Sequence, residues 1–219
     1  MPMSVSEAAE RLGLSSSRVK QMLVAGDLPG ERVGHVWVLN ERDVRDAIAR
    51  WRPRGRPLSQ QMAAGLVDLL AQQFGSTEGR AWLALDNRNR SRLRSHLRAL
   101  RGADHPAALL RALAPNVSER RTFHYTDPLQ PLLDDGRLLA GGNLNQAVGM
   151  PGGDAYDFHI AAADVAAVIA HHLLVEDPRG NLTLHVQAAP RADLAASLLD
   201  LALRGGSRAD AVVAERIQA

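Results

Sequence analysis

The sequence predicts an α+β fold for this chain of 219 residues. Three observations lead to that class. Residues 1–51 combine short helical patterns with a hairpin pattern, residues 59–115 hold leucine-rich helical patterns, and residues 116–219 mix strand-like and helical stretches. Arginine, proline and glycine dominate the intervening residues 52–58. We therefore expect a small N-terminal domain, a basic linker, a helical bundle and a small C-terminal α+β domain.

The first domain begins with two short helices that meet at a glycine. The first helix is expected to start near Ser4 or Ser6, because Ser4 and Glu7 have the spacing of a capping box. Its apolar positions recur at helical spacing: Val5, Ala8, Ala9 and Leu12. Gly13 ends this helix, since glycine tolerates the left-handed conformation at a helix end, and Leu14 packs in the turn.

The second helix has an outward face suited to DNA. Ser15 caps its start, Gly26 follows its end, and its inward positions are Val19, Met22 and Leu23. Serine, arginine, lysine and glutamine side chains donate to phosphates and to base edges in the major groove. The predicted DNA-binding residues here are Ser15, Ser16, Ser17, Arg18, Lys20 and Gln21, the last three reading bases and Ser16 and Ser17 lying near phosphates.

A hairpin and a third helix complete the domain. Residues 32–33 and 36–38 are strand-like, and Gly34-His35 forms a two-residue loop in which a leading glycine suits a type II′ turn. Asn40 caps a helix whose apolar positions are Val44, Ala47, Ile48 and Trp51. Two helices followed by such a hairpin outline a winged helix-turn-helix, in which Arg32 and His35 are predicted to contact DNA.

These pieces together form a recognisable pattern. Residues 4–51 read S-x-x-E-A-A-x-x-L-G-L-S, a helix, G-x-L-P, a strand pair with a tryptophan, and N-x-x-D-V. The pattern resembles the excisionase/MerR-like helix-turn-helix family, which implies binding to double-stranded DNA through residues 15–25 and the wing around residues 32–36. The wing tip of that family often has arginine where this sequence has His35, so weaker or pH-sensitive wing contacts to phosphate are expected. The alternative is a helix-turn-helix used only for protein contacts.

Composition limits the possible classes of protein. The chain has no cysteine, so it forms neither disulfides nor thiolate metal sites, and a reducing cytoplasm is expected. We find no signal peptide and no apolar run long enough to span a membrane. A single lysine stands against 25 arginines, a bias that predicts a GC-rich bacterial genome. Residues 1–102 have a net charge of +7 and residues 103–219 a net charge of −5, so the front half is expected to meet a polyanion.

The linker and the middle region add further basic residues. Arg54-Gly55-Arg56-Pro57 resembles the core of an AT-hook, which implies that Arg54 and Arg56 enter the minor groove; the alternative is a plain basic linker.

Helices are expected from Ser59, from Thr77 through Leu85, over residues 86–101 and over residues 106–113. Six arginines lie in the third of these: Arg88, Arg90, Arg92, Arg94, Arg98 and Arg101. They form either a second phosphate-binding surface or a face that is solvated or paired with acids of the back half.

The back half shows no catalytic motif. Neither a phosphate loop nor G-x-S-x-G occurs, and the adjacent His171 and His172 point in different directions on a helix, so they cannot chelate one metal. Three more histidines lie in strand-like runs and could converge with Asp127 or Asp157 on one sheet face: His124, His159 and His185. We interpret these histidines as structural, and we predict no catalytic, cofactor-binding or metal-binding residue and no enzymatic activity.

The end of the chain suggests a second resemblance. A strand-like run ends at Val186-Gln187-Ala188-Ala189-Pro190, and Asp193-Leu194 and Asp200-Leu201 follow in a helical pattern. This arrangement is similar to the tail of antitoxin regulators of the abortive-infection E class. The resemblance implies an autorepressor encoded beside a nucleotidyltransferase toxin. The alternatives are a phage excisionase-like architectural protein, and a ligand-sensing regulator or hydrolase that uses the back-half histidines. A homodimer would supply the DNA affinity that one module lacks.

Overall fold

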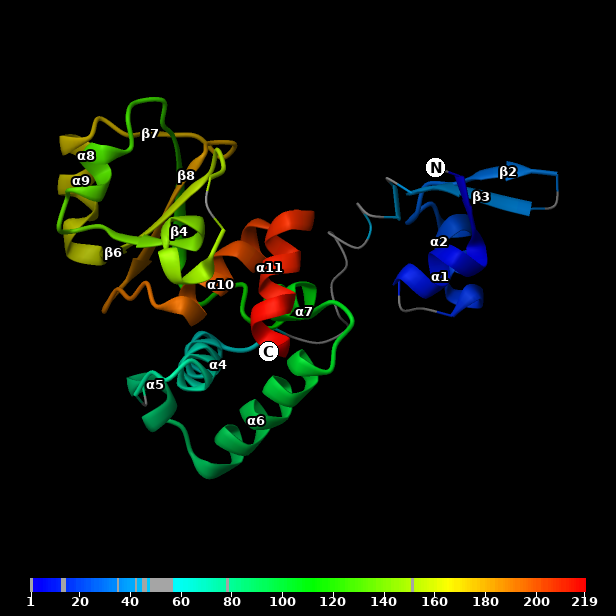
Figure 1. Ribbon diagram of the computed structural model, residues 1–219, viewed down its shortest axis with the longest axis horizontal. Coiled ribbons are helices and arrows are strands. Elements are labelled where there is room, and N and C mark those ends of the chain that lie inside the picture. Colours follow the sequence, from blue (N-terminus) through cyan, green and yellow to red (C-terminus); the bar gives the residue numbers. More distant parts are fainter. Residues whose placement is uncertain are drawn as a thin grey trace. The chain divides into compact units, whose positions relative to one another are not determined.

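The computed structural model describes residues 2–12, 15–34, 36–41, 43, 44, 47, 57–77, 79–150 and 152–219. The chain divides into two compact units, Met1–Pro53 and Arg54–Ala219 (Figure 1). Helices and two separate sheets are present, which confirms the predicted α+β class. Within the described ranges, no helix combines the length and the apolar character needed to cross a bilayer.

The first unit has two helices and a small antiparallel sheet. The helices are α1 (Val5–Leu12) and α2 (Ser16–Ala25), and the strands are β1 (Pro2–Ser4), β2 (Glu31–Val33) and β3 (Val36–Asn40) in the order β1-β3-β2. The predicted hairpin is confirmed, because Val33 pairs with Val36 across a two-residue loop. The sequence did not indicate β1, whose three residues become a strand only because β3 pairs with them. A third helix includes residues 41, 43, 44 and 47, and its predicted continuation lies outside the described residues.

Six helices of the second unit share one hydrophobic core. They are α4 (Gln60–Gln73), α5 (Arg80–Leu83), α6 (Asn87–Arg101), α7 (Pro106–Leu113), α10 (Leu194–Arg204) and α11 (Ser207–Gln218). The division expected at residues 115/116 does not separate two cores, because α10 is apolar on most of its surface and must be covered on more than one side. The helix expected from Thr77 is shortened to α5, and the chain then turns so that Asp86 caps α6.

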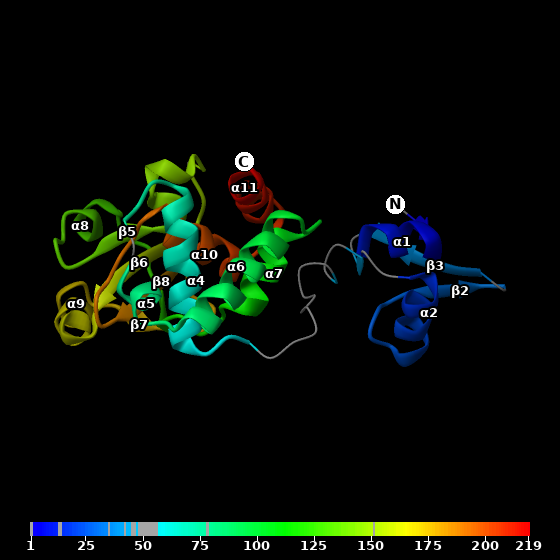
Figure 2. The same cartoon turned by 90° about the horizontal axis from the view of Figure 1, so that it is seen from below.

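A five-stranded sheet forms the rest of this unit. Its strands are β4 (Glu119–His124), β5 (Leu139–Gly141), β6 (Tyr156–Ala161), β7 (Val175–Glu176) and β8 (Leu182–Gln187), in the order β5-β6-β8-β4-β7. Only β6 and β8 are parallel. Short helical segments accompany the sheet: α8 (Gln130–Leu133), α9 (Val165–His171), η1 (Gly142–Leu144), η2 (Gln146–Val148) and η3 (Ala162–Asp164). Figure 2 shows α8 and α9 beyond the sheet on the side away from α4 and α10.

The two faces of the sheet differ in chemistry because side chains alternate along a strand. Phe158, Ile160 and Leu184 belong to the apolar cluster that also contains residues of α8 and α9. Asp157 and His159 alternate with those residues on β6 and therefore lie on the opposite face. Tertiary contacts join α10 to α4, α7, η1 and β5, so α10 lies between the helical layer and this polar face.

Candidate nucleic-acid interface

The first helix is fixed at its start by the predicted capping box. The backbone N–H of Ser4 donates to Glu7 Oε2 at 2.7 Å, and the N–H of Glu7 donates to Ser4 Oγ at 3.2 Å. The N–H of Ser4 holds the pKa of Glu7 below its usual value. At the other end of α1, Arg11 pairs with Glu41 at 2.8 Å, which joins α1 to the start of the third helix.

The second helix is capped at both ends as the sequence indicates. Ser15 Oγ accepts from the N–H of Arg18 at 3.2 Å. Gly26 adopts a left-handed conformation with φ 77°, and its N–H donates to the carbonyl of Leu23 at 3.3 Å. Val19 and Leu23 are buried, so one side of α2 packs against the core and the opposite side is free for a ligand.

The outward face of α2 presents polar and basic side chains. Ser16, Ser17, Lys20 and Gln21 are exposed, whereas Arg18 is half-buried. Arg18 Nη1 donates to Gln21 Oε1 at 3.3 Å, so these two side chains are held beside one another. Such a face can donate hydrogen bonds to phosphates and to base edges.

Sequence reasoning missed an apolar member of this face. Val24 is 78% exposed on a helix whose other side packs against the core. Val24 lies one helical turn after Lys20, a predicted DNA-binding residue. This i, i+4 spacing could have placed Val24 on the DNA-facing side from the sequence alone. An exposed aliphatic group beside donors suits contact with a thymine methyl group.

The wing is short and only weakly basic. Arg32 is exposed on β2 and pairs across the hairpin with Trp37, while Val33 and Val36 at the tip are 59% and 61% exposed. Gly34 has φ 63°, as a two-residue hairpin loop requires. At the base of the wing Gly30 lies against Leu23, and a side chain there would collide with the core. The predicted contacts by His35, Arg54 and Arg56 lie outside the described residues.

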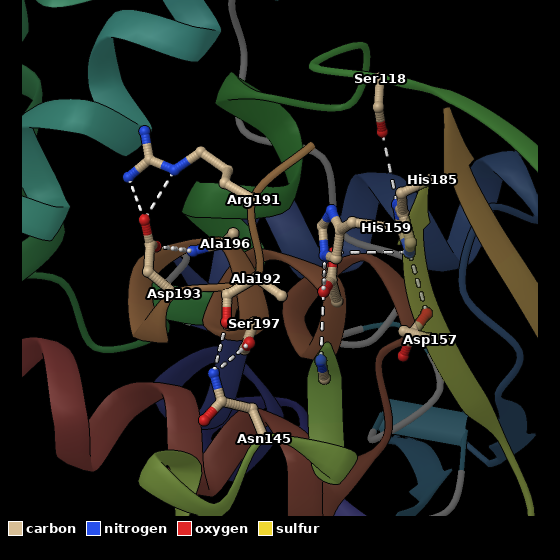
Figure 3. Close-up of polar contacts among 12 residues, drawn as sticks. Ser118, Asn145, Asp157, His159, His185, Arg191, Ala192, Asp193, Ala196 and Ser197 are labelled. Carbon is tan, nitrogen blue, oxygen red and sulfur yellow. Dashed lines mark hydrogen bonds and ion pairs between the residues drawn. The ribbon is translucent and has the colours of Figure 1, made fainter. Parts of the chain in front are cut away.

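Two of the candidate histidines of the second unit meet in its interior (Figure 3). The parallel register of β6 and β8 places His159 opposite His185, and their rings stack with centroids 4.9 Å apart. His159 Nε2 lies 2.8 Å from Asp200 Oδ2, and His185 Nε2 lies 3.0 Å from Asp157 Oδ1. All four side chains are buried, and we call them the histidine–aspartate cluster.

Further polar groups surround this cluster. Arg204 pairs with Asp157 and donates to Asn143 Oδ1 at 3.1 Å, and the N–H of Gly142 donates to Asp200 Oδ2 at 3.2 Å. Ser118 Oγ lies 3.4 Å from the Nδ1 atom of His185, a weak contact. Arg204 therefore compensates the charge of Asp157, and the two histidines and a backbone N–H provide polar partners for Asp200, as buried carboxylates require.

Burial and neighbouring groups act in opposite directions on the pKa values of His185 and Asp200. Burial lowers the pKa of His185, although the nearby Asp200 opposes this effect. Burial alone would raise the pKa of Asp200, but the two histidines and the N–H of Gly142 outweigh it, so the pKa of Asp200 lies below its usual value. His159 Nδ1 is buried and has no hydrogen-bond partner within the described part of the chain.

The other predicted members of the cluster lie elsewhere. His124 and Asp127 are exposed and do not join it. His172 Nε2 donates to Asp135 Oδ2 at 2.9 Å, while its neighbour His171 is exposed. Among the residues that the structure describes, no three His, Asp or Glu side chains are arranged to hold a metal ion. Sequence reasoning missed Asp200 and Arg204, which lie on a helix far along the chain and gave no local signal.

Comparison with known proteins identifies the first unit. Residues 2–52 match a family model described as a helix-turn-helix domain. A protein from Thermus thermophilus named "Probable plasmid-partitioning protein ParA" is 49% identical over 39 residues, which are 18% of this chain and 12% of that protein. The chain thus spans about an eighth of that relative's length. No solved structure matches the chain. The N-terminal unit is a helix-turn-helix domain, and it supports a DNA-binding regulator.

Proposed function

We propose that this protein is a bacterial cytoplasmic transcriptional regulator that represses its own gene by binding double-stranded DNA upstream of it. The observation that supports this most directly is the polar, exposed face of α2, held at both ends by caps within a helix-turn-helix domain. In such domains the second helix enters the major groove. The proposal assigns base readout to Arg18, Lys20 and Gln21, and phosphate contacts to Ser16 and Ser17, with Ser15 at the DNA-facing start of the same helix.

Electrophoretic mobility shift with the full-length protein tests this proposal. A duplex from upstream of its own gene should bind more tightly than a random duplex of equal length and composition. The double variant Lys20→Ala/Gln21→Ala should lose that preference. The double variant Arg179→Ala/Gln146→Ala changes exposed residues of the second unit and should retain it. Equal affinity of the unmodified protein for both duplexes would contradict the proposal.

Autorepression has its own readout. A reporter gene placed behind the protein's own promoter should be silenced when the protein is supplied from a second plasmid. Silencing should disappear with Lys20→Ala/Gln21→Ala while the protein level stays the same. Reporter expression could stay unchanged even though the protein prefers the upstream duplex in the mobility shift. That result would contradict autorepression and retain only DNA binding.

We further propose that the second unit gives this regulator an antitoxin role. The support is the similarity of its tail to abortive-infection E antitoxins, in which a strand stops at Ala-Pro before a helix. Here β8 ends at Gln187, Pro190 follows, and Asp193 caps α10 by accepting from the N–H of Ala196 at 3.0 Å. Expression of the neighbouring gene alone should then arrest growth, and co-expression of this protein should restore it.

Within this proposal the histidine–aspartate cluster stabilises the second unit and performs no reaction. The support is that its carboxylates are paired with Arg204, His159 and His185 inside the fold. Substitution of His159 by Gln should therefore lower stability without changing DNA preference in the mobility shift. A loss of operator preference with unchanged stability would favour the ligand-sensing alternative.

A further inference from the structure

The excess positive charge of the front half lies mostly outside the helix-turn-helix unit. Residues 1–53 have eight basic and seven acidic side chains, a net charge of +1. Residues 54–102 have nine basic and three acidic side chains, a net charge of +6. Neutralisation of phosphates supplies nearly all non-specific DNA affinity and a large share of specific affinity. The unit that reads bases is therefore poor in the charge that holds a protein on DNA.

Most of the basic side chains of residues 54–102 lie on α6. Arg90, Arg94, Arg98 and Arg101 recur at three- and four-residue spacing, so they lie along one side of the helix, about 6 Å apart for each four-residue step. We call these four residues the arginine stripe. Leu93, Leu97 and Leu100 occupy a different side and are buried. Arg94, Arg98 and Arg101 are exposed, Arg90 is half-buried, and Figure 1 shows α6 at the periphery of the second unit.

The side chains of the stripe contact neutral groups. Among the described residues, no carboxylate forms an ion pair with them. Arg90 Nη2 donates to the carbonyl of Leu83 at 2.8 Å, and Arg94 lies 5.3 Å from the centre of the Trp82 ring. Arg98 donates to a serine hydroxyl at 3.2 Å, and Arg101 donates to a glutamine side chain at 2.6 Å. The guanidinium groups are thus oriented by neutral groups, and no carboxylate of the described residues neutralises their charge.

Two acids close to α6 in the sequence, Asp68 and Asp86, are engaged in other contacts. Asp68 on α4 is buried, accepts from the N–H of Trp82 at 2.9 Å and pairs with Arg191. Asp86 caps α6 by accepting from the N–H of Asn89 at 2.7 Å. Among the described residues, no ion pair joins an acid of residues 103–219 to the stripe, so these arginines are not paired with the back half there.

We propose that the arginine stripe is a second DNA-binding surface, which contacts the sugar–phosphate backbone of the duplex bound by the helix-turn-helix unit and reads no bases. This inference rests on the proposed function, because it uses the same DNA. Charge complementarity indicates the ligand, because guanidinium groups that recur along one helix side and pair with no described carboxylate match a regular row of phosphates. Because the two units are covalently joined, binding of the first raises the effective concentration of DNA at the second.

The test measures the salt dependence of DNA binding by the full-length protein. Dissociation constants are determined between about 50 and 200 mM salt for the upstream duplex and for a random duplex. Arg94→Gln/Arg98→Gln is compared with Arg120→Gln/Arg179→Gln, which removes the same charge from exposed positions of the sheet region. Each lost phosphate contact makes the slope of log K against log salt less steep by about 0.9. The stripe variant lacks two arginines, so its slope should be less steep than that of the unmodified protein by about 2.

Further outcomes decide the inference. The stripe variant should weaken both duplexes by the same factor and keep the preference for the upstream one, and Arg94→Lys/Arg98→Lys should restore most of the slope. Equal slopes for the stripe variant and the unmodified protein would overturn the stripe while the proposed function stands. An equal loss of slope in the Arg120/Arg179 control would also overturn it, since total charge alone would then explain the effect. Absence of any upstream preference in the unmodified protein would instead refute the proposed function. Thermal unfolding checks that each variant is folded.

Discussion

Gln21 is one of two predicted base-reading residues of α2 whose side chains are joined by a hydrogen bond. Arg18 donates to its amide oxygen at 3.3 Å, which leaves the amide NH2 of Gln21 directed to other acceptors. A glutamine that reads DNA forms paired hydrogen bonds with adenine, so its orientation before binding lowers the entropy cost of recognition. Ser17 is exposed on the same helix but has only a hydroxyl to offer, which suits a phosphate better than a unique base.

The first prediction separates base readout from phosphate contact. Gln21→Ala should weaken binding to the upstream duplex by about 1–3 kcal/mol and leave random-duplex binding nearly unchanged. Ser17→Ala should weaken both duplexes by a similar factor. Fluorescence anisotropy titrations on the two duplexes measure this difference. If Gln21→Ala weakens the random duplex equally, Gln21 contacts the backbone and the assignment is wrong.

The second prediction concerns His185 and pH. Its pKa is lowered by burial from the ordinary value of 6.5, so the unfolded chain binds a proton more readily than the folded one as pH falls. The contribution of neutral, buried His185 to the free energy of unfolding should therefore be fully present well above pH 6.5 and be lost as pH falls through 6.5 toward 5.5. Urea denaturation at pH 7.5, 6.5 and 5.5 measures the slope.

A matched pair of variants tests the origin of this slope. His185→Gln should make the pH dependence shallower, while His124→Gln, at an exposed position, should leave it unchanged. Some dependence should persist, because burial also lowers the pKa of His96. Identical slopes for His185→Gln and the unmodified protein would show that His185 is not the titrating group.

At the scale of elements, local sequence accounts for α1 and α2 almost completely. The capping serines, the apolar spacing and the glycine at residue 26 are all short-range features, and each has the geometry that its residue type favours. The cap of α2 is of functional interest, because Ser15 accepts from the backbone of Arg18 and so fixes the turn that bears the predicted base-reading residues.

The third prediction tests that cap. Ser15→Ala should lower the stability of the first unit by about 1 kcal/mol, since one N–H at the start of α2 loses its acceptor. Ser16→Ala removes an exposed serine one position later, which serves as the control. Hydrogen exchange of the amides of residues 17–19 measures the local effect. Equal exchange rates in both variants would mean that water replaces the cap at no cost.

At the scale of the whole chain, the second unit is built around α10. Leu198 is fully buried in the core that includes α4, α6 and α7, while Asp200 on the same helix binds His159 and the N–H of Gly142. One helix thus connects the apolar core of the helical layer with the polar face of the sheet. The helical layer and the sheet should consequently unfold together.

The fourth prediction follows from this arrangement. Leu198→Ala should destabilise the second unit by about 2–5 kcal/mol, because it leaves a cavity in a close-packed core. The background Trp37→Phe/Trp51→Phe leaves Trp82 as the tryptophan whose fluorescence is followed. In that background, Leu198→Ala should lower the unfolding midpoint of the second unit by the same amount whether it is followed by Trp82 fluorescence or by far-ultraviolet circular dichroism. An early fluorescence transition followed by a separate transition of the sheet would show that residues 59–115 unfold independently.

The sequence by itself determined the structural features that depend on residues close together in the chain, such as helices, caps and the hairpin. The two helices and the hairpin of the first unit follow from caps, glycines and apolar spacing within about 40 residues, and the family comparison agrees with them. The arginine-rich run of α6 and its buried leucine side are likewise evident from helical spacing. Interactions of this kind are short-range, so residue types and their order specify them.

Only the tertiary structure decided the contacts between distant segments. The alternation of β6 predicted a strand but not its parallel pairing with β8, which places His159 beside His185. Asp200 reaches His159 across 41 positions of the sequence, and α10 merges the two regions that composition had separated. Strand register and helix docking depend on how all apolar faces are buried at once, and no local pattern encodes that outcome.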